Sequence, residues 1–67
     1  MNITLNNRLE SFDAQTLSVA EILKVKKFSF KMLVIKLNGK FVMDEDRETT
    51  FVKDGDLLAI IHLESGG

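Results

Sequence analysis

The sequence predicts a two-layer α+β domain in which one helix packs across a mixed sheet of four to five strands. Three patterns predict it: an alternating polar and apolar start, a capping box before a short amphipathic stretch, and an Asn-Gly pair between two apolar runs. They give the element order β-β-α-β-β-β, with a charged loop before the last strand. The chain has 67 residues, 45% of them hydrophobic, which suits one domain with one small core. We expect this domain to span residues 1–63.

The chain begins with a predicted hairpin. Residues 1–6 form its first strand, since apolar and polar side chains alternate with the period of two of a half-buried strand. Asn6 and Asn7 supply a tight turn, because asparagine tolerates the left-handed backbone region. Residues 8–12 then return as the second strand, with Leu9 as its inward residue.

A single helix follows a predicted loop at residues 13–16. Ser18 and Glu21 have the spacing of a capping box, in which each side chain bonds the backbone N–H of the other residue. Lysines crowd the last turn, where positive charge suits the helix dipole, so we expect the helix to begin at Ser18 and to end near Lys27. Its apolar positions at helical spacing form the buried stripe: Val19, Ile22 and Leu23.

The next predicted strand, residues 31–38, is mostly apolar on both faces, which favours a place inside the sheet. Asn38-Gly39 is the strongest short hairpin signal, because both central turn residues need a positive φ. The partner strand is residues 40–43. One row of the apolar strand holds Leu33, Ile35 and Leu37, and the other holds Met32, Val34 and Lys36.

The last third of the chain starts with a charged loop at residues 44–50. We expect Phe51 and Val52 to return to the core. A turn at residues 54–56 leads into the last strand, residues 57–63.

The chain then ends in two glycines, and residues 64–67 read as a tail. Glycine adds no side chain to a core and costs the most backbone entropy to order, so Gly66-Gly67 is a poor end for a fold. A tail without Cβ atoms can instead lie in a narrow channel and carry the carboxylate of Gly67 into the active site of another enzyme. A cloning remnant or a cut linker is the alternative.

A partner that binds the tail must also contact the folded domain. If Leu58 faces the helix, alternation along the last strand turns its other row outward, beside the tail. Exposed apolar patches often mark protein interfaces, and the alternative is an ordinary surface. The predicted docking residues are Ala59, Ile61 and Leu63, with Val34 from the neighbouring strand.

Other classes of site have weaker support. The acidic residues at 44–48 lack the loop glycine and ligand spacing of an EF-hand, so we expect a solvated loop whose carboxylates could meet a basic partner. The lysines at 24–31 interleave with phenylalanines that we assign to the core, and His62 has no neighbouring ligand in the sequence. We therefore expect no bound metal and no nucleic-acid partner.

Composition supports these exclusions. The chain has no cysteine, which excludes a disulfide, a thiol nucleophile and a thiolate zinc site. Its net charge of −1 disfavours binding to nucleic acid or to anionic membranes, and no apolar run approaches the roughly 18 residues of a membrane span. We expect a cytoplasmic protein.

Taken together, the ordered motifs resemble ThiS, the sulfur carrier family of thiamine biosynthesis, over essentially the whole chain. The resemblance implies the β-grasp fold, which ThiS shares with ubiquitin and with the molybdopterin sulfur carrier MoaD. The chain departs from ThiS at residues 43–48, where members often carry Pro, Arg and Trp. The motifs that carry the resemblance are Met1-Asn2-Ile3-Thr4-Leu5-Asn6, Val19-Ala20-Glu21-Ile22-Leu23, Leu37-Asn38-Gly39, Asp54-Gly55-Asp56 and Gly66-Gly67.

The resemblance implies a protein co-substrate and not an enzyme. A ThiF-type adenylating enzyme would use ATP to adenylate Gly67, and sulfur from cysteine, delivered by a desulfurase, would replace AMP to give a thiocarboxylate. A thiazole synthase would then take the sulfur. Gly66 and Ser65 would thread through the partner, and the carrier itself would bind no cofactor stably and would be monomeric.

Three alternatives stay open on the sequence. One is a MoaD-like carrier or a carrier for another pathway, since the sequence does not identify the final sulfur acceptor. Another is a ubiquitin-like modifier, whose Gly67 would be joined to lysines of other proteins. The last is a binding module of the same fold with an artificial tail.

Overall fold

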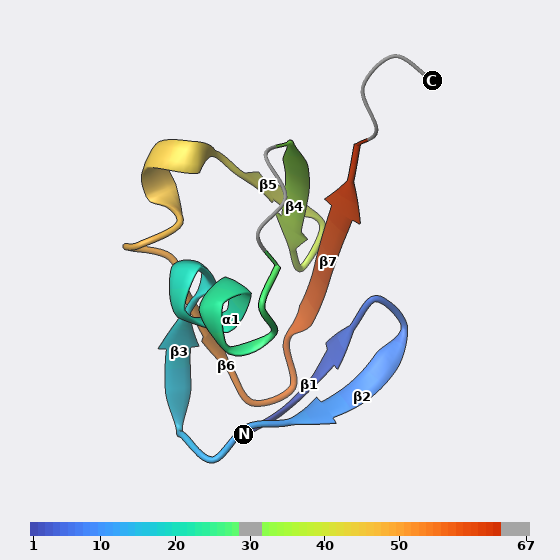
Figure 1. The fold of residues 1–67 in the computed structure, drawn as a ribbon. Helices are drawn as coiled ribbons and strands as arrows, with labels where there is room; N and C mark the ends of the chain where they lie inside the picture. The colour runs from blue at the N-terminus through green and yellow to red at the C-terminus, as the bar shows by residue number, and fades with distance from the viewer. Residues whose placement is uncertain (29–31, 64–67) are drawn as a thin grey trace.

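The fold of the computed structural model, which describes residues 1–28 and 32–63, is a mixed five-stranded sheet with one helix against it (Figure 1). This confirms the predicted α+β class. The elements in chain order are β1 (Asn2–Leu5), β2 (Arg8–Ser11), β3 (Thr16–Ser18), α1 (Val19–Val25), β4 (Leu33–Leu37), β5 (Lys40–Val42), a 3₁₀ turn (Asp44–Asp46), β6 (Phe51–Lys53) and β7 (Leu57–His62).

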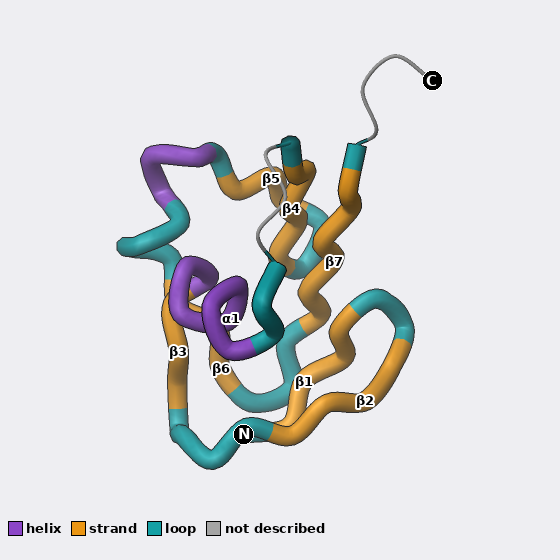
Figure 2. Tube along the Cα trace, in the orientation of Figure 1, coloured by secondary structure: helices purple, strands orange, loops and turns teal. Residues whose placement is uncertain are grey.

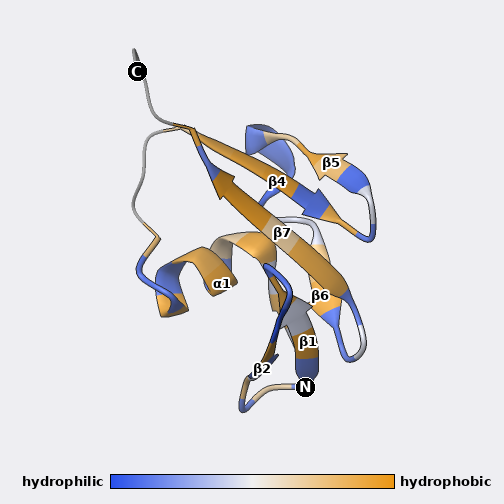
Figure 3. Cartoon of the chain, turned by 90° about the vertical axis from the view of Figure 1, so that its right-hand side faces the viewer, coloured by the Kyte–Doolittle hydropathy of each residue, from blue (hydrophilic) through white to orange (hydrophobic). Residues whose placement is uncertain are grey.

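Strand β7 lies at the centre of the sheet, whose order is β2-β1-β7-β4-β5. It pairs in parallel with β1 and antiparallel with β4, so the last strand joins the two hairpins of the chain. Figure 3 shows that β7 is hydrophobic along most of its length, as expected for a strand with neighbours on both sides. Strand β4 also has two neighbours, which agrees with its predicted place inside the sheet.

The predicted capping box starts the helix. The Ser18 hydroxyl accepts a hydrogen bond from the Glu21 backbone N–H at 3.0 Å, and the Glu21 carboxylate accepts one from the Ser18 N–H at 2.9 Å. The helix ends at Val25 with Lys26 as its C-cap, close to the predicted end. Lys27 follows with a φ of 59°, a left-handed conformation that cannot continue a helix.

Both predicted hairpin turns also form. Asn6 and Asn7 adopt φ values of 50° and 67°, and Asn38 and Gly39 adopt 51° and 85°. Two successive residues with positive φ match the right-handed twist of the strands that they join. Local sequence signals therefore fixed the two hairpins of the sheet.

A second, two-stranded sheet was missed by the sequence analysis. Thr16 begins β3, although residues 13–16 were predicted as a loop, and β3 pairs antiparallel with β6 (Figure 2). Val52 is fully buried as predicted, but the prediction for Phe51 was wrong, since 57% of its surface is exposed. The reason is strand alternation: neighbours in β6 point to opposite faces, so only one can reach the core.

The core fills the space between α1 and the sheets. Leu9 does not belong to it, contrary to the prediction, because Leu9 is 77% exposed and is opposite Thr4, on the face away from the helix. In β2 the residues on the helix side are Arg8 and Glu10, and Glu10 forms an ion pair with Lys26 beyond the helix at 2.8 Å. The buried apolar residues are Ile3, Leu5, Val19, Ile22, Ile35, Val52, Leu58 and Ile60.

The charged segment after β5 is tied to the domain through Arg47. Its guanidinium pairs with Asp44 at 2.8 Å, and its carbonyl accepts a hydrogen bond from the Ala20 N–H at the start of α1. In the part of the chain that the structure describes, the single α-helix is too short to cross a membrane.

Candidate partner-docking face

The candidate site is the face of the five-stranded sheet that points away from α1, here called the outer face. Alternation along β7 buries Leu58 and Ile60 on the helix side and turns Ala59 and Ile61 to the outer face. Val34 is opposite Ile61 across the β4–β7 ladder. The structure thus brings these three predicted docking residues together, on two adjacent strands.

Leu63 extends this row beyond the end of β7. Its N–H donates a hydrogen bond to the Met32 carbonyl at 3.0 Å, which carries the pairing with the neighbouring segment one residue further. Leu63 is 43% exposed and Ile61 is 47% exposed, so both present apolar surface to solvent. The predicted tail residues Glu64, Ser65, Gly66 and Gly67 lie outside the described residues.

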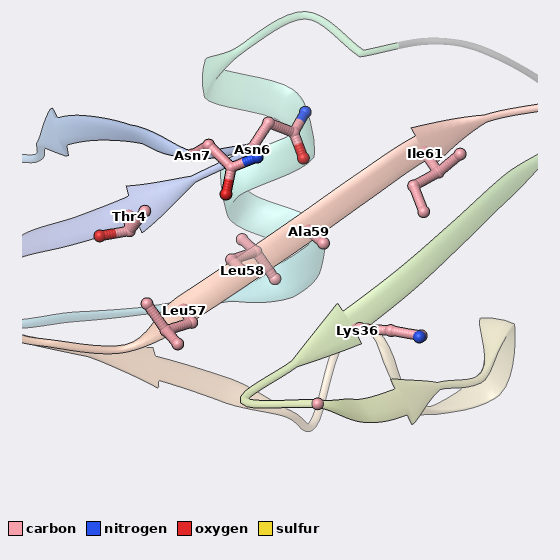
Figure 4. Close-up of a pocket in the computed structure, with 9 residues that line it drawn as sticks. Thr4, Asn6, Asn7, Lys36, Leu57, Leu58, Ala59 and Ile61 are labelled. Carbon is pink, nitrogen blue, oxygen red and sulfur yellow. The ribbon is translucent and has the colours of Figure 1, made fainter.

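An open groove of about 400 Å³ runs across the outer face beside β7 (Figure 4). Leu57, Ala59 and Ile61 supply its apolar surface, and polar side chains from β1, the first turn and β4 stand around it. The complete lining is Thr4, Asn6, Asn7, Lys36, Gly39, Leu57, Leu58, Ala59 and Ile61.

The hairpin tip that borders the groove is held by Asn38. Its backbone N–H donates to the Leu57 carbonyl at 2.7 Å, and its side-chain oxygen accepts from the Leu57 N–H at 2.8 Å. Its amide nitrogen also donates to the buried carboxylate of Asp56, which accepts a further bond from the Lys53 N–H. The hairpin tip is therefore held against the start of β7, where it forms one side of the groove.

Several groove residues were not singled out by the sequence analysis. Lys36 was assigned to the same row as Val34, so its outward direction was available from alternation alone. Thr4 and Leu57 become neighbours only because β1 and β7 pair in parallel across 53 positions of sequence, from Thr4 to Leu57. No local pattern signals that pairing.

The other candidate sites gain no support from the geometry. Within residues 1–28 and 32–63, no group of three His, Asp or Glu side chains is placed to hold a metal ion. His62 is exposed at the end of β7, and Phe28 packs against the core, as predicted. Lys26 is paired with Glu10, which removes one cation from the predicted basic cluster. Phe30 and Lys31 lie outside the described residues.

Comparison with known proteins links this chain to one family. A family model described as the ThiS family matches residues 3–67. The crystal structure of the thiamine biosynthesis protein ThiS from Geobacter metallireducens superposes with a TM-score of 0.89 at 33% identity, covering all of both chains. The solution structure of a thiamine biosynthesis protein from the same organism gives a TM-score of 0.81 at 33% identity, covering 100% of this chain and 88% of that one.

Proposed function

Because the chain belongs to the ThiS family, we propose that it is a sulfur carrier protein of thiamine biosynthesis. The observation that carries the proposal is the family match over residues 3–67, which includes both terminal glycines, together with a structural match over the full length of a ThiS protein. The implied β-grasp fold is the fold of that relative.

The chemistry that we propose takes place at the Gly67 carboxylate. A carboxylate is a poor electrophile, so a ThiF-type enzyme joins it to the AMP part of ATP and releases pyrophosphate. A desulfurase persulfide, whose outer sulfur originates from cysteine, then displaces AMP to form an acyl disulfide, and a thiol reductant cleaves its S–S bond to leave the thiocarboxylate. A thiazole synthase takes this sulfur, and the carrier returns with its carboxylate restored.

In this scheme the chain is a co-substrate and its partners are the enzymes. Gly67 is the reacting residue, Gly66 keeps the backbone beside it slim, and Ser65 gives the tail reach. ATP is bound by the adenylating enzyme, and the carrier acts as a monomer in the cytoplasm. The outer face, with Val34, Ala59, Ile61 and Leu63, is the surface that we propose for docking on the adenylating enzyme.

Mass spectrometry of the intact chain tests this function. The full chain is incubated with the ThiF-type enzyme of the same organism, ATP, cysteine, a desulfurase and a thiol reductant. We expect a mass increase equal to the exchange of one oxygen for one sulfur, and no increase for the variant that lacks Gly66 and Gly67. An unchanged wild-type mass would overturn the proposal. Isopeptide conjugates to other proteins would favour the ubiquitin-like modifier instead.

A further inference from the structure

Lys36 is a cation placed among the apolar side chains of the outer face. The ladders that flank β4 place it opposite Ala59 of β7 (Figure 4) and opposite Phe41 of β5. Its ammonium nitrogen lies 4.9 Å from the centre of the Phe41 ring, within the range of a cation–π contact. Lys36 is the charged residue among those that line the groove.

Within residues 1–28 and 32–63, no carboxylate forms an ion pair with this cation. Among the described residues the ion pairs are Lys26 with Glu10 and Arg47 with Asp44, and Lys36 belongs to neither. The two acidic residues that precede β7 are already used, since Asp56 bonds Asn38 and Asp54 accepts from the Asn2 N–H. Among the described residues, the Phe41 ring is the contact that stabilises the ammonium.

Docking of a partner would change the solvation of the Lys36 ammonium. A partner that covers Ala59 and extends across β4 toward Phe41 would also remove water from Lys36. A charge that is buried at an interface without a counter-charge weakens binding, whereas a matched pair fixes the register and the choice of partner. An outer face selected only for apolar contact would carry an uncharged side chain at this central position.

We infer that the adenylating enzyme seats an Asp or Glu carboxylate, flanked by apolar side chains, against the Lys36 ammonium, at the edge of this groove where β4 pairs with β5. The inference deepens the proposed function and rests on it. Phe41 is then a positioning residue, because its ring holds the ammonium at the side of β4 that is away from β7. In the complex, Lys36 determines which partner is accepted, and the apolar residues around it supply most of the buried contact area.

Replacement of the charge alone gives a sharp test. Lys36→Met keeps the methylene stem and removes the ammonium, and Lys40→Met is the matched control, because Lys40 is exposed and is opposite Leu37, in the helix-side row. We expect Lys36→Met to weaken binding to the ThiF-type enzyme of the same organism by at least about 30-fold, with Lys40→Met near wild type. Circular dichroism checks that both variants fold. Unchanged or tighter binding of Lys36→Met would overturn the inference.

Cross-linking with a carbodiimide gives a second readout that needs no variant. This reagent joins an amine directly to a carboxylate, so we expect the complex to yield a peptide in which Lys36 is linked to an Asp or Glu of the enzyme. A complex that is cross-linked through other lysines, with Lys36 unmodified, would contradict the inference.

The two proposals can fail separately. If the wild-type chain gains no sulfur, the proposed function fails. If the wild-type chain gains sulfur while Lys36→Met binds and reacts equally well, the function stands and the role of Lys36 is wrong.

Discussion

The side-chain amide of Asn6 pairs with the backbone of Ile60 as a further rung of the β1–β7 ladder. The amide oxygen accepts from the Ile60 N–H at 2.8 Å, and the amide nitrogen donates to the Ile60 carbonyl at 3.1 Å. Strand β1 ends at Leu5, so without Asn6 both groups of Ile60 would lose these bonds in the middle of the sheet. The turn residue therefore also anchors the strand that carries the candidate docking face.

Removal of this amide should destabilise the domain. We expect Asn6→Ala to lower the free energy of unfolding by about 1–3 kcal/mol, because it leaves a partly buried N–H and carbonyl without their partner. Asn7→Ala is the matched control, since Asn7 has a similar positive φ but no side-chain bond to β7. Urea denaturation measures both. Equal losses would show that backbone conformation, and not the amide pair, explains the effect.

The capping box makes stability depend on pH in the acidic range. Hydrogen bonds from the backbone and then the side chain of Ser18 lower the pKa of Glu21 below its ordinary value of 4.5, and Lys24 adds to this while desolvation opposes it. A lowered folded pKa gives stability that is present above pH 4.5 and is lost as pH falls through the folded value.

We therefore expect Glu21→Gln to be less stable than wild type at neutral pH, with a difference that shrinks as the pH falls below 4.5. Thermal unfolding followed by circular dichroism at several pH values measures this. A difference that stays constant from neutral to acidic pH would mean that ionised Glu21 does not stabilise the helix start.

Ile60 and Ile61 are neighbours on β7, but we expect their replacement by alanine to change stability by very different amounts. Ile60 is 7% exposed and belongs to the core, so Ile60→Ala should cost about 2–5 kcal/mol of stability. Ile61 points to the outer face, and Ile61→Ala should change stability by only about 0.5 kcal/mol. Denaturant titration of the two variants compares them directly. Similar losses at both positions would mean that the outer face is packed in solution.

A charge on the outer face should act on binding and not on folding. We expect Ile61→Asp to weaken binding to the adenylating enzyme by about tenfold or more, since it places a carboxylate in an apolar contact. Phe51→Asp is the control, because Phe51 is also an exposed apolar residue but lies on β6, in the other sheet. Calorimetry on both variants gives the affinities. Equal effects would indicate a general response to added charge, and the outer face would lose its special role.

The sequence predicted the features that depend on neighbours along the chain. Ser18 and Glu21 are three positions apart, and each Asn turn joins two strands that follow one another, so the side chains that decide the conformation lie within a few residues. The direction of Ile61 followed from strict alternation once Leu58 was placed inside. Local sequence patterns do not identify the final sulfur acceptor or place the tail.

The two errors have different causes: Leu9 lies in a local hairpin whose register was not taken into account, and Phe51 lies on a strand whose partner is distant in sequence. Leu9 was assigned inward from its apolar character alone, but the register with Thr4 places it outside and puts Glu10 on the side where Lys26 can pair with it. Phe51 was placed in the core, although the β3–β6 ladder has room for only one inward residue near that point, and Val52 fills it. Hydrophobicity alone does not set a register when two strands are separated by tens of residues.

By itself the sequence determined the helix, its cap, both hairpins and the outward row of the last strand, because each is governed by contacts a few residues long. Only the tertiary structure decided that β7 lies between β1 and β4, and that Lys36 stands beside Ala59 with no carboxylate of the described residues paired with it. The reason is that β1 and β7, the first and last strands, pair in parallel. No periodicity in the sequence indicates which distant strands will pair.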